Sequence, residues 1–111
     1  MPLFDAERVD ALFAALGEAQ GRRLLDHFAD ALTVELQALT AIAAEGDLCE
    51  TERHAHGLKG AAANFGATRL QAVSREVEQA ARAANGAQAL NALLAELGRV
   101  AVKTSVAARK L

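Results

Sequence analysis

The sequence of 111 residues has no tryptophan and no tyrosine, and its only proline, Pro2, stands at the start of the chain. β-Sandwiches and barrels usually carry aromatic residues in their strands and proline at their edges and turns. The near absence of both argues against such folds, whereas the abundance of alanine favours helix. The composition therefore predicts an all-α fold.

The chain also has few cysteines, no long apolar run and little net charge, and each of these features argues against a class of protein. A single cysteine, Cys49, allows no internal disulfide, which is compatible with a reducing cytoplasm. No apolar run approaches the roughly 20 residues of a membrane span, and early Asp5 and Glu7 do not fit a secretory signal. The net charge of −2, with acids and bases interspersed, offers no surface for nucleic acid. We expect a cytoplasmic protein that binds neither membrane nor nucleic acid.

The apolar periodicity predicts one short helix and four long ones. Asp5 is suited to cap the short helix, and Gly17 to end it. Apolar residues then recur every three or four positions over residues 18–45, 48–64, 67–84 and 87–108. Gly21 falls in the first turn of the first long helix, so we expect this helix to start at residue 18 or a few residues later. Asn85-Gly86 ends the third long helix. The predicted core positions are Leu25, Phe28, Leu32, Leu36, Leu39, Ile42, Leu48, Ala55, Leu58, Ala62, Phe65, Leu70, Val73, Val77, Ala81, Leu90, Leu94, Leu97, Ala101 and Thr104.

Four long amphipathic helices joined by short loops favour an antiparallel up-down bundle, with the short N-terminal helix capping one end. A chain of this length supports one core. We therefore expect a single domain over residues 1–111.

The helix predicted over residues 48–64 has an unusual outer surface. His56 lies about 130° from the centre of the packing stripe, so it faces solvent. Lys59 and Gly60 follow at i+3 and i+4, on the same side of the helix. Because glycine costs a helix up to about 1 kcal/mol relative to alanine, Gly60 needs a reason. Bare backbone beside the ring would let the active site of a partner approach closely.

This pattern suits phosphoryl chemistry. A neutral imidazole is a nucleophile near neutral pH. Attack by His56 on a phosphoryl group would leave a phosphohistidine with close to two negative charges, which Lys59 is placed to offset.

The segment Ala55-His56-Gly57-Leu58-Lys59-Gly60, followed by Gly66, resembles the signature of histidine-containing phosphotransfer (HPt) domains. That signature is His-x-Leu-Lys-Gly with a second glycine ten residues after the histidine, and this chain matches each position. Chain length, helical pattern and motif position also suit the family. The resemblance implies the same helical bundle.

The resemblance also implies roles for single residues. His56 would accept a phosphoryl group from an aspartate of one response-regulator receiver domain and pass it to another. Lys59 would compensate charge, Gly60 would be the side-chain-free approach position, and Gly66 would form the turn that sets the next helix. The receiver domain would bring Mg²⁺, so this chain would bind no cofactor of its own.

Glu78 departs from the family pattern, which commonly has glutamine at this place on the next helix. A carboxylate there either accepts the second N–H of the ring and holds its tautomer, or repels the phosphoryl group. The i,i+4 spacing also pairs Glu78 with Arg82 on the outside of the helix. We further expect a docking patch of small and apolar residues around His56, near Arg22 and Arg23 of the first long helix.

Other chemistry finds little support. There is no Gly-rich phosphate loop after a strand, and no serine or cysteine is paired with a base, so we expect a phosphocarrier without ATP-binding or autokinase activity. His54 and His56 point about 160° apart on a helix, and no cysteine or carboxylate cluster completes a metal site. No dimer seam is left over on the last helix, so we expect a monomer.

Two alternatives remain open. One is a helical adaptor that binds receiver or kinase domains without being phosphorylated, although such an adaptor has no chemical need of His56, Lys59 and Gly60. The other is an HPt module excised from a hybrid histidine kinase, although the chain carries neither an ATP-binding region nor a dimerising hairpin pattern.

Overall fold

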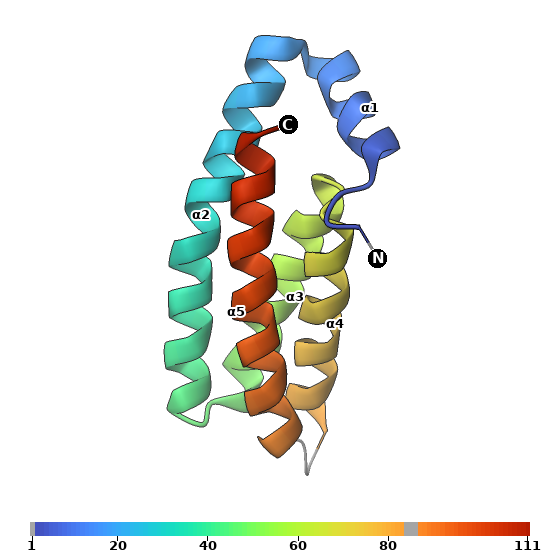
Figure 1. Ribbon diagram of the computed structural model, residues 1–111. Coiled ribbons are helices and arrows are strands. Elements are labelled where there is room, and N and C mark those ends of the chain that lie inside the picture. The colour runs from blue at the N-terminus through green and yellow to red at the C-terminus, as the bar shows by residue number, and fades with distance from the viewer. Residues whose placement is uncertain (1, 84–86) are drawn as a thin grey trace.

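The computed structural model describes residues 2–83 and 87–111, and five helices make up most of these two ranges (Figure 1). Helices α2 to α5 run alternately in opposite directions and form an antiparallel bundle, in which each helix packs against its two neighbours. The short α1 folds back from the start of α2 over one end of the bundle. The described ranges contain no strand, and the predicted all-α bundle is confirmed. The helices are α1 (Ala6–Leu16), α2 (Glu18–Ala44), α3 (Leu48–Asn64), α4 (Thr68–Arg82) and α5 (Ala87–Arg109).

The helix boundaries agree closely with those expected from the sequence. Helix α2 begins at Glu18, so Gly21 lies inside its first turn. A Cβ on Gly21 would lie 2.5 Å from Cδ1 of Phe13, so the missing side chain lets the ring from α1 pack directly against α2. Helix α4 begins after Ala67, and its predicted end at Asn85-Gly86 lies outside the described residues.

An aliphatic core runs the length of the bundle. Near the end covered by α1, Phe28 and Phe65 stack with their ring centroids 4.5 Å apart. The prediction that Leu48 packs was wrong, because Leu48 is the first residue of α3 and is 41% exposed. Thr51, one turn further on, takes the inward position and donates to the carbonyl of Asp47. The core cluster consists of Phe28, Leu32, Leu39, Ala55, Leu58, Ala62, Ala67, Leu70, Val73, Val77, Leu90, Leu97, Val100 and Ala101.

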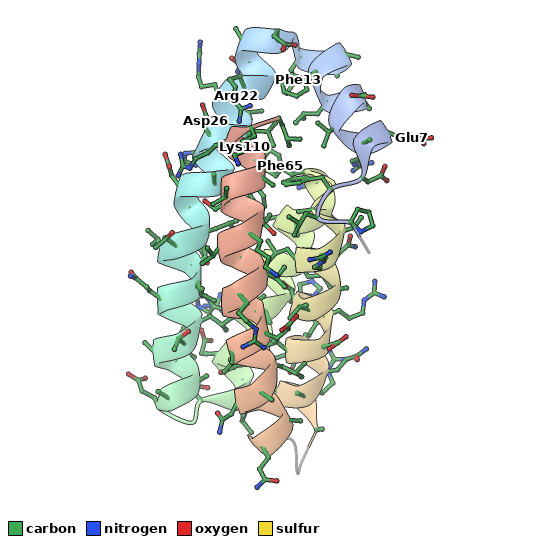
Figure 2. The ribbon with its side chains drawn as sticks, in the orientation of Figure 1. Glu7, Phe13, Arg22, Asp26, Phe65 and Lys110 are labelled. Carbon is green, nitrogen blue, oxygen red and sulfur yellow. The ribbon has the colours of Figure 1, made fainter. Side chains whose placement is uncertain are left out.

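Arg22 ties the start of α2 to the end of α5 (Figure 2). Its guanidinium donates to the carbonyls of Ala108 and Leu111 at the C-terminal end of α5, and it pairs with Asp26 at 2.8 Å. Arg22, which the sequence analysis placed near the expected docking patch, therefore has partners within the fold. That patch stays a prediction.

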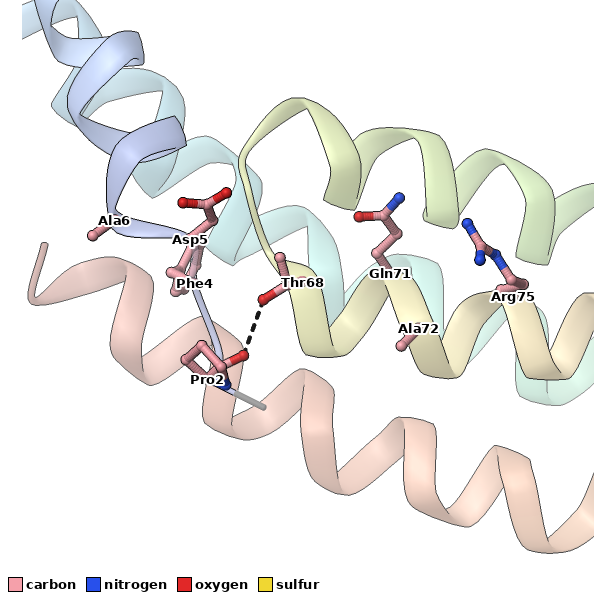
Figure 3. Close-up of a pocket in the computed structure, with 8 residues that line it drawn as sticks. All are labelled: Pro2, Phe4, Asp5, Ala6, Thr68, Gln71, Ala72 and Arg75. Carbon is pink, nitrogen blue, oxygen red and sulfur yellow. Dashed lines mark hydrogen bonds between the residues drawn. The ribbon is translucent and has the colours of Figure 1, made fainter.

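The N-terminal segment and the turn between α3 and α4 hold each other in place. The N–H of Asp5 donates to the carbonyl of Gly66 at 2.8 Å, and the hydroxyl of Thr68 donates to the carbonyl of Pro2 at 3.0 Å (Figure 3). Gly66 has a φ of +69°, and a Cβ on it would lie 2.7 Å from Cβ of Arg8. Both the backbone conformation and the close approach of α1 therefore require glycine here. A groove of about 720 Å³ remains beside this segment, lined by Pro2, Phe4, Asp5, Ala6, Thr68, Gln71, Ala72 and Arg75.

Replacing this glycine is expected to destabilise the fold. Gly66→Ala should lower the free energy of unfolding by about 1–2 kcal/mol, because alanine is strained at a positive φ and its methyl group meets Arg8. Gly57→Ala is the matched control. The space around Gly57 is open, so alanine should raise stability by up to about 1 kcal/mol. Urea denaturation measures both, and a Gly66→Ala protein as stable as wild type would contradict the left-handed turn.

Candidate functional site

His56 stands on the solvent side of α3. Asp47 caps this helix by accepting from the N–H of Glu50, and Ala55 and Leu58 bury the opposite side in the core. These contacts fix the rotation of α3 about its own axis. The His56 side chain is consequently left 69% exposed.

Glu78 of α4 is buried between the two helices and holds two side chains of α3. Its Oε2 lies 2.6 Å from Nδ1 of His56, and its Oε1 accepts from Nζ of Lys59 at 2.7 Å. The Glu78 side chain is 6% exposed, which corrects the expectation that Glu78 lies on the outside of its helix. Each oxygen has its own partner, so the buried charge is compensated.

The ionised form of Glu78 is favoured by these partners. The pKa of the Glu78 carboxyl is lowered, and the hydrogen bond from Lys59 is the largest cause. Burial acts in the opposite direction and raises this pKa, whereas the hydrogen bond with His56 lowers it further. An ionised carboxylate only accepts hydrogen bonds, so Nδ1 of His56 is the donor. In the neutral ring, Nε2 then carries a free lone pair. Of the two roles that the sequence left open for Glu78, the geometry fits the one that holds the tautomer.

The backbone beside the ring is bare. A Cβ built on Gly57 or Gly60 would meet no atom within 4 Å, so neither glycine is required by packing. Both have ordinary helical backbone, where alanine would stabilise the helix by up to about 1 kcal/mol. Since the fold gains nothing from these glycines, the open surface points to a use outside the chain.

His56 and Glu78 share a shallow groove of about 370 Å³ with Cys49, Glu52, Arg53 and Arg82. The larger groove at the N-terminal segment has no lining residue in common with it. Arg82 bridges the two helices here, with its Nη2 2.8 Å from Glu52 Oε1 and 3.9 Å from Glu78 Oε2. Sequence reasoning missed Glu52. The available signal was its i−4 position to His56, which puts it on the same face of α3.

Other site classes find no support in the part of the chain that the structure describes. No three histidine, cysteine or acidic side chains gather there to hold a metal ion. His54 turns away from His56, and its Nε2 lies 3.8 Å from Glu50. None of the helices described is long and apolar enough to cross a membrane.

Comparison with protein families adds independent information. The family model described as Hpt domain matches residues 23–108, which include all of α3 and α4. The chain belongs to the Hpt domain family. A search of curated proteins gave no match, and neither did a search of solved structures.

Membership in the Hpt family implies a phosphotransfer role in two-component signalling. Hpt domains are phosphocarriers, and as a family they generally interact with receiver domains. The family match leaves α1 and the first turn of α2 outside.

The buried carboxylate of Glu78 should make the stability of this Hpt domain depend on pH in the acid range. Because the pKa of Glu78 is lowered by folding, the unfolded chain binds more protons at acid pH, and stability is lost as pH falls below the ordinary value for glutamate. We expect the free energy of unfolding to fall more steeply between about pH 5 and pH 3 in wild type than in Glu78→Gln.

Glu35→Gln is the control for this measurement, because it removes an exposed carboxylate of α2. Chemical denaturation at a series of pH values gives the three curves. Parallel curves for wild type and Glu78→Gln would contradict the ionised pairing of Glu78.

Proposed function

We propose that this Hpt domain is a phosphorelay phosphocarrier, which accepts a phosphoryl group on Nε2 of His56 from a receiver-domain aspartate and passes it to another receiver. The observation that carries the proposal is the contact of 2.6 Å between Nδ1 of His56 and the buried Glu78. It turns the other ring nitrogen into a free nucleophile on an exposed side chain. The family match supports phosphotransfer, and this contact supports the atom that performs it.

The transfer balances without loss of a proton. The lone pair of Nε2 attacks phosphorus, an N–P bond forms, and the P–O bond to the donor aspartate breaks, with its electrons leaving on the carboxylate. The ring becomes a phosphorylated imidazolium whose Nδ1 proton still faces Glu78. The negative carboxylate stabilises that positive ring, as a carboxylate behind a catalytic histidine does. In the reverse direction, an acceptor aspartate attacks phosphorus and the ring leaves as neutral imidazole.

Lys59 supplies charge compensation in this proposal. Its ammonium is held 2.7 Å from Glu78 and so stays within one helical turn of His56. The phosphoryl group brings close to two negative charges, which a nearby ammonium offsets. Mg²⁺ comes with the receiver domain, and the chain itself contributes no cofactor.

The docking face that we propose centres on the bare backbone of Gly57 and Gly60. The middle of α2 borders it, because Glu35 shares a small groove with Gly57. Val34, the neighbour of Glu35, is 64% exposed and adds an apolar contact. A small, mixed surface suits transient docking better than permanent association. We further propose that the protein is a cytoplasmic monomer and that residues 1–111 form one domain.

Transfer to His56 is tested with a panel of phosphorylated receiver domains and Mg²⁺, without ATP. We expect at least one receiver to label the wild type and none to label His56→Gln. The label should be lost in acid and survive base, as a phosphoryl group on imidazole nitrogen does. If receivers bind the folded protein but never transfer label to it, the non-phosphorylated adaptor is favoured instead. The test gives the same answer for a free-standing protein and for a module excised from a hybrid histidine kinase.

Gly60→Ala should separate the stability of the helix from its function. The added methyl group meets no atom of the chain, so the free energy of unfolding should rise by up to about 1 kcal/mol. The same methyl group obstructs the approaching receiver, so the rate of transfer should fall about tenfold or more.

Gly98→Ala on α5 is the matched control. Its Cβ would make an ordinary contact of 3.8 Å with Leu36, so it should stabilise the helix and leave transfer unchanged. Equal transfer rates in Gly60→Ala and wild type would contradict the role of Gly60 as an approach position.

A further inference from the structure

We infer that Arg82 is a second cation for the phosphoryl group, held beside the site by Glu52 until His56 is phosphorylated. This role rests on the function proposed above and extends it to residues outside the sequence motif. On phosphorylation, the guanidinium leaves Glu52 and pairs with the phosphoryl oxygens. Glu52 thus acts as a placeholder for the phosphoryl group.

The geometry brings Arg82 to the edge of the reacting ring. Its Nε donates to Oε1 of Glu52 at 2.9 Å, and its Nη2 lies 2.8 Å from the same oxygen. Its Nη2 also lies 3.9 Å from Oε2 of Glu78, which is the oxygen that holds Nδ1 of His56. All four side chains line the same groove. A rotation of the exposed guanidinium, without movement of α4, changes its partner.

The charges of the unphosphorylated site already balance in pairs. Lys59 faces Glu78, Arg82 faces Glu52, and Arg53 faces Glu50. A phosphoryl group adds close to two negative charges, and Lys59 is shared with a carboxylate that stays ionised. The phosphoryl oxygens therefore call for a second cation close to the ring. Arg82 lines the same groove as His56 and lies 3.9 Å from Oε2 of Glu78, so it can take this place.

The exchange of partners is favourable on general grounds. The Arg82 side chain is 63% exposed, and an exposed ion pair such as Glu52–Arg82 contributes little to stability. A phosphoryl group is more highly charged than a carboxylate and accepts two parallel hydrogen bonds from a guanidinium. The pair in the free protein is thus strong enough to orient Arg82 and weak enough to release it.

Substitution of the two partners should have opposite effects on the phosphorylated state. We expect Arg82→Gln to lower the equilibrium constant for transfer from a phosphorylated receiver to His56 about fivefold, and Glu52→Gln to raise it about threefold. A pair that merely held α3 against α4 would change the constant in the same direction in both variants. Arg99→Gln is the control, because Arg99 pairs with Glu96 on α5 and is equally exposed.

A second measurement reports the contact itself and needs no receiver. Phosphoramidate is used to phosphorylate the ring, with formation of the N–P bond at His56 and loss of ammonia. The guanidinium N–H signals are then compared by NMR before and after. We expect the Arg82 Nε–H signal to shift on phosphorylation in wild type, and the Arg99 signal to stay in place.

The possible outcomes separate the two proposals. If His56 is phosphorylated while the Arg82 signal stays in place, or while Arg82→Gln and Glu52→Gln change the equilibrium constant in the same direction, the role of Arg82 is overturned and the carrier function stands. If neither phosphoramidate nor any receiver phosphorylates His56, the carrier function fails, and the role of Arg82 fails with it.

Discussion

The hydrogen bond between the buried carboxylate of Glu78 and Nδ1 of His56 joins α4 to α3 at the exposed ring of His56. A carboxylate buried between two helices is unfavourable unless it is paired and hydrogen-bonded. Here Lys59 and His56 each occupy one oxygen. The same pair of contacts favours the ionised form of Glu78 and, in the neutral ring, places the free lone pair on Nε2. The electrostatic requirement of the fold and the chemical requirement of the site are therefore met by the same atoms.

The rest of the bundle serves to keep α3 and α4 in this register. The small residues Ala55 and Ala62 bury one face of α3, so the opposite face can be left almost bare. The tight turn at Gly66 returns the chain into α4 and is held by the N-terminal segment. Gly57 and Gly60 lower the intrinsic stability of the helix without any packing benefit. Sites that violate the local rules of stability in this way are expected where function imposes its own demand.

Much of this arrangement could be predicted from the sequence, because it depends on local patterns. Helical periodicity and glycine punctuation located the helices, and the phase of α3 alone placed His56, Lys59 and Gly60 together. The burial of Glu78 depends instead on how far α4 is rotated and shifted against α3, which only the packing of both helices decides. The exposure of Leu48 and the use of Arg22 at the end of α5 likewise depend on where distant segments meet. The Glu52–Arg82 pair joins residues of two helices, so no pattern within one helix reveals it.

The most direct test of the account is to identify the ring nitrogen that carries the phosphoryl group. Long-range ¹H–¹⁵N NMR spectra of the phosphorylated chain, in which the two nitrogens of a phosphohistidine are distinguished, provide the answer. Because Glu78 engages Nδ1, the account predicts phosphorylation of His56 at Nε2. A phosphoryl group on Nδ1 would show that the contact with Glu78 does not govern the chemistry of the ring, and would contradict the central claim.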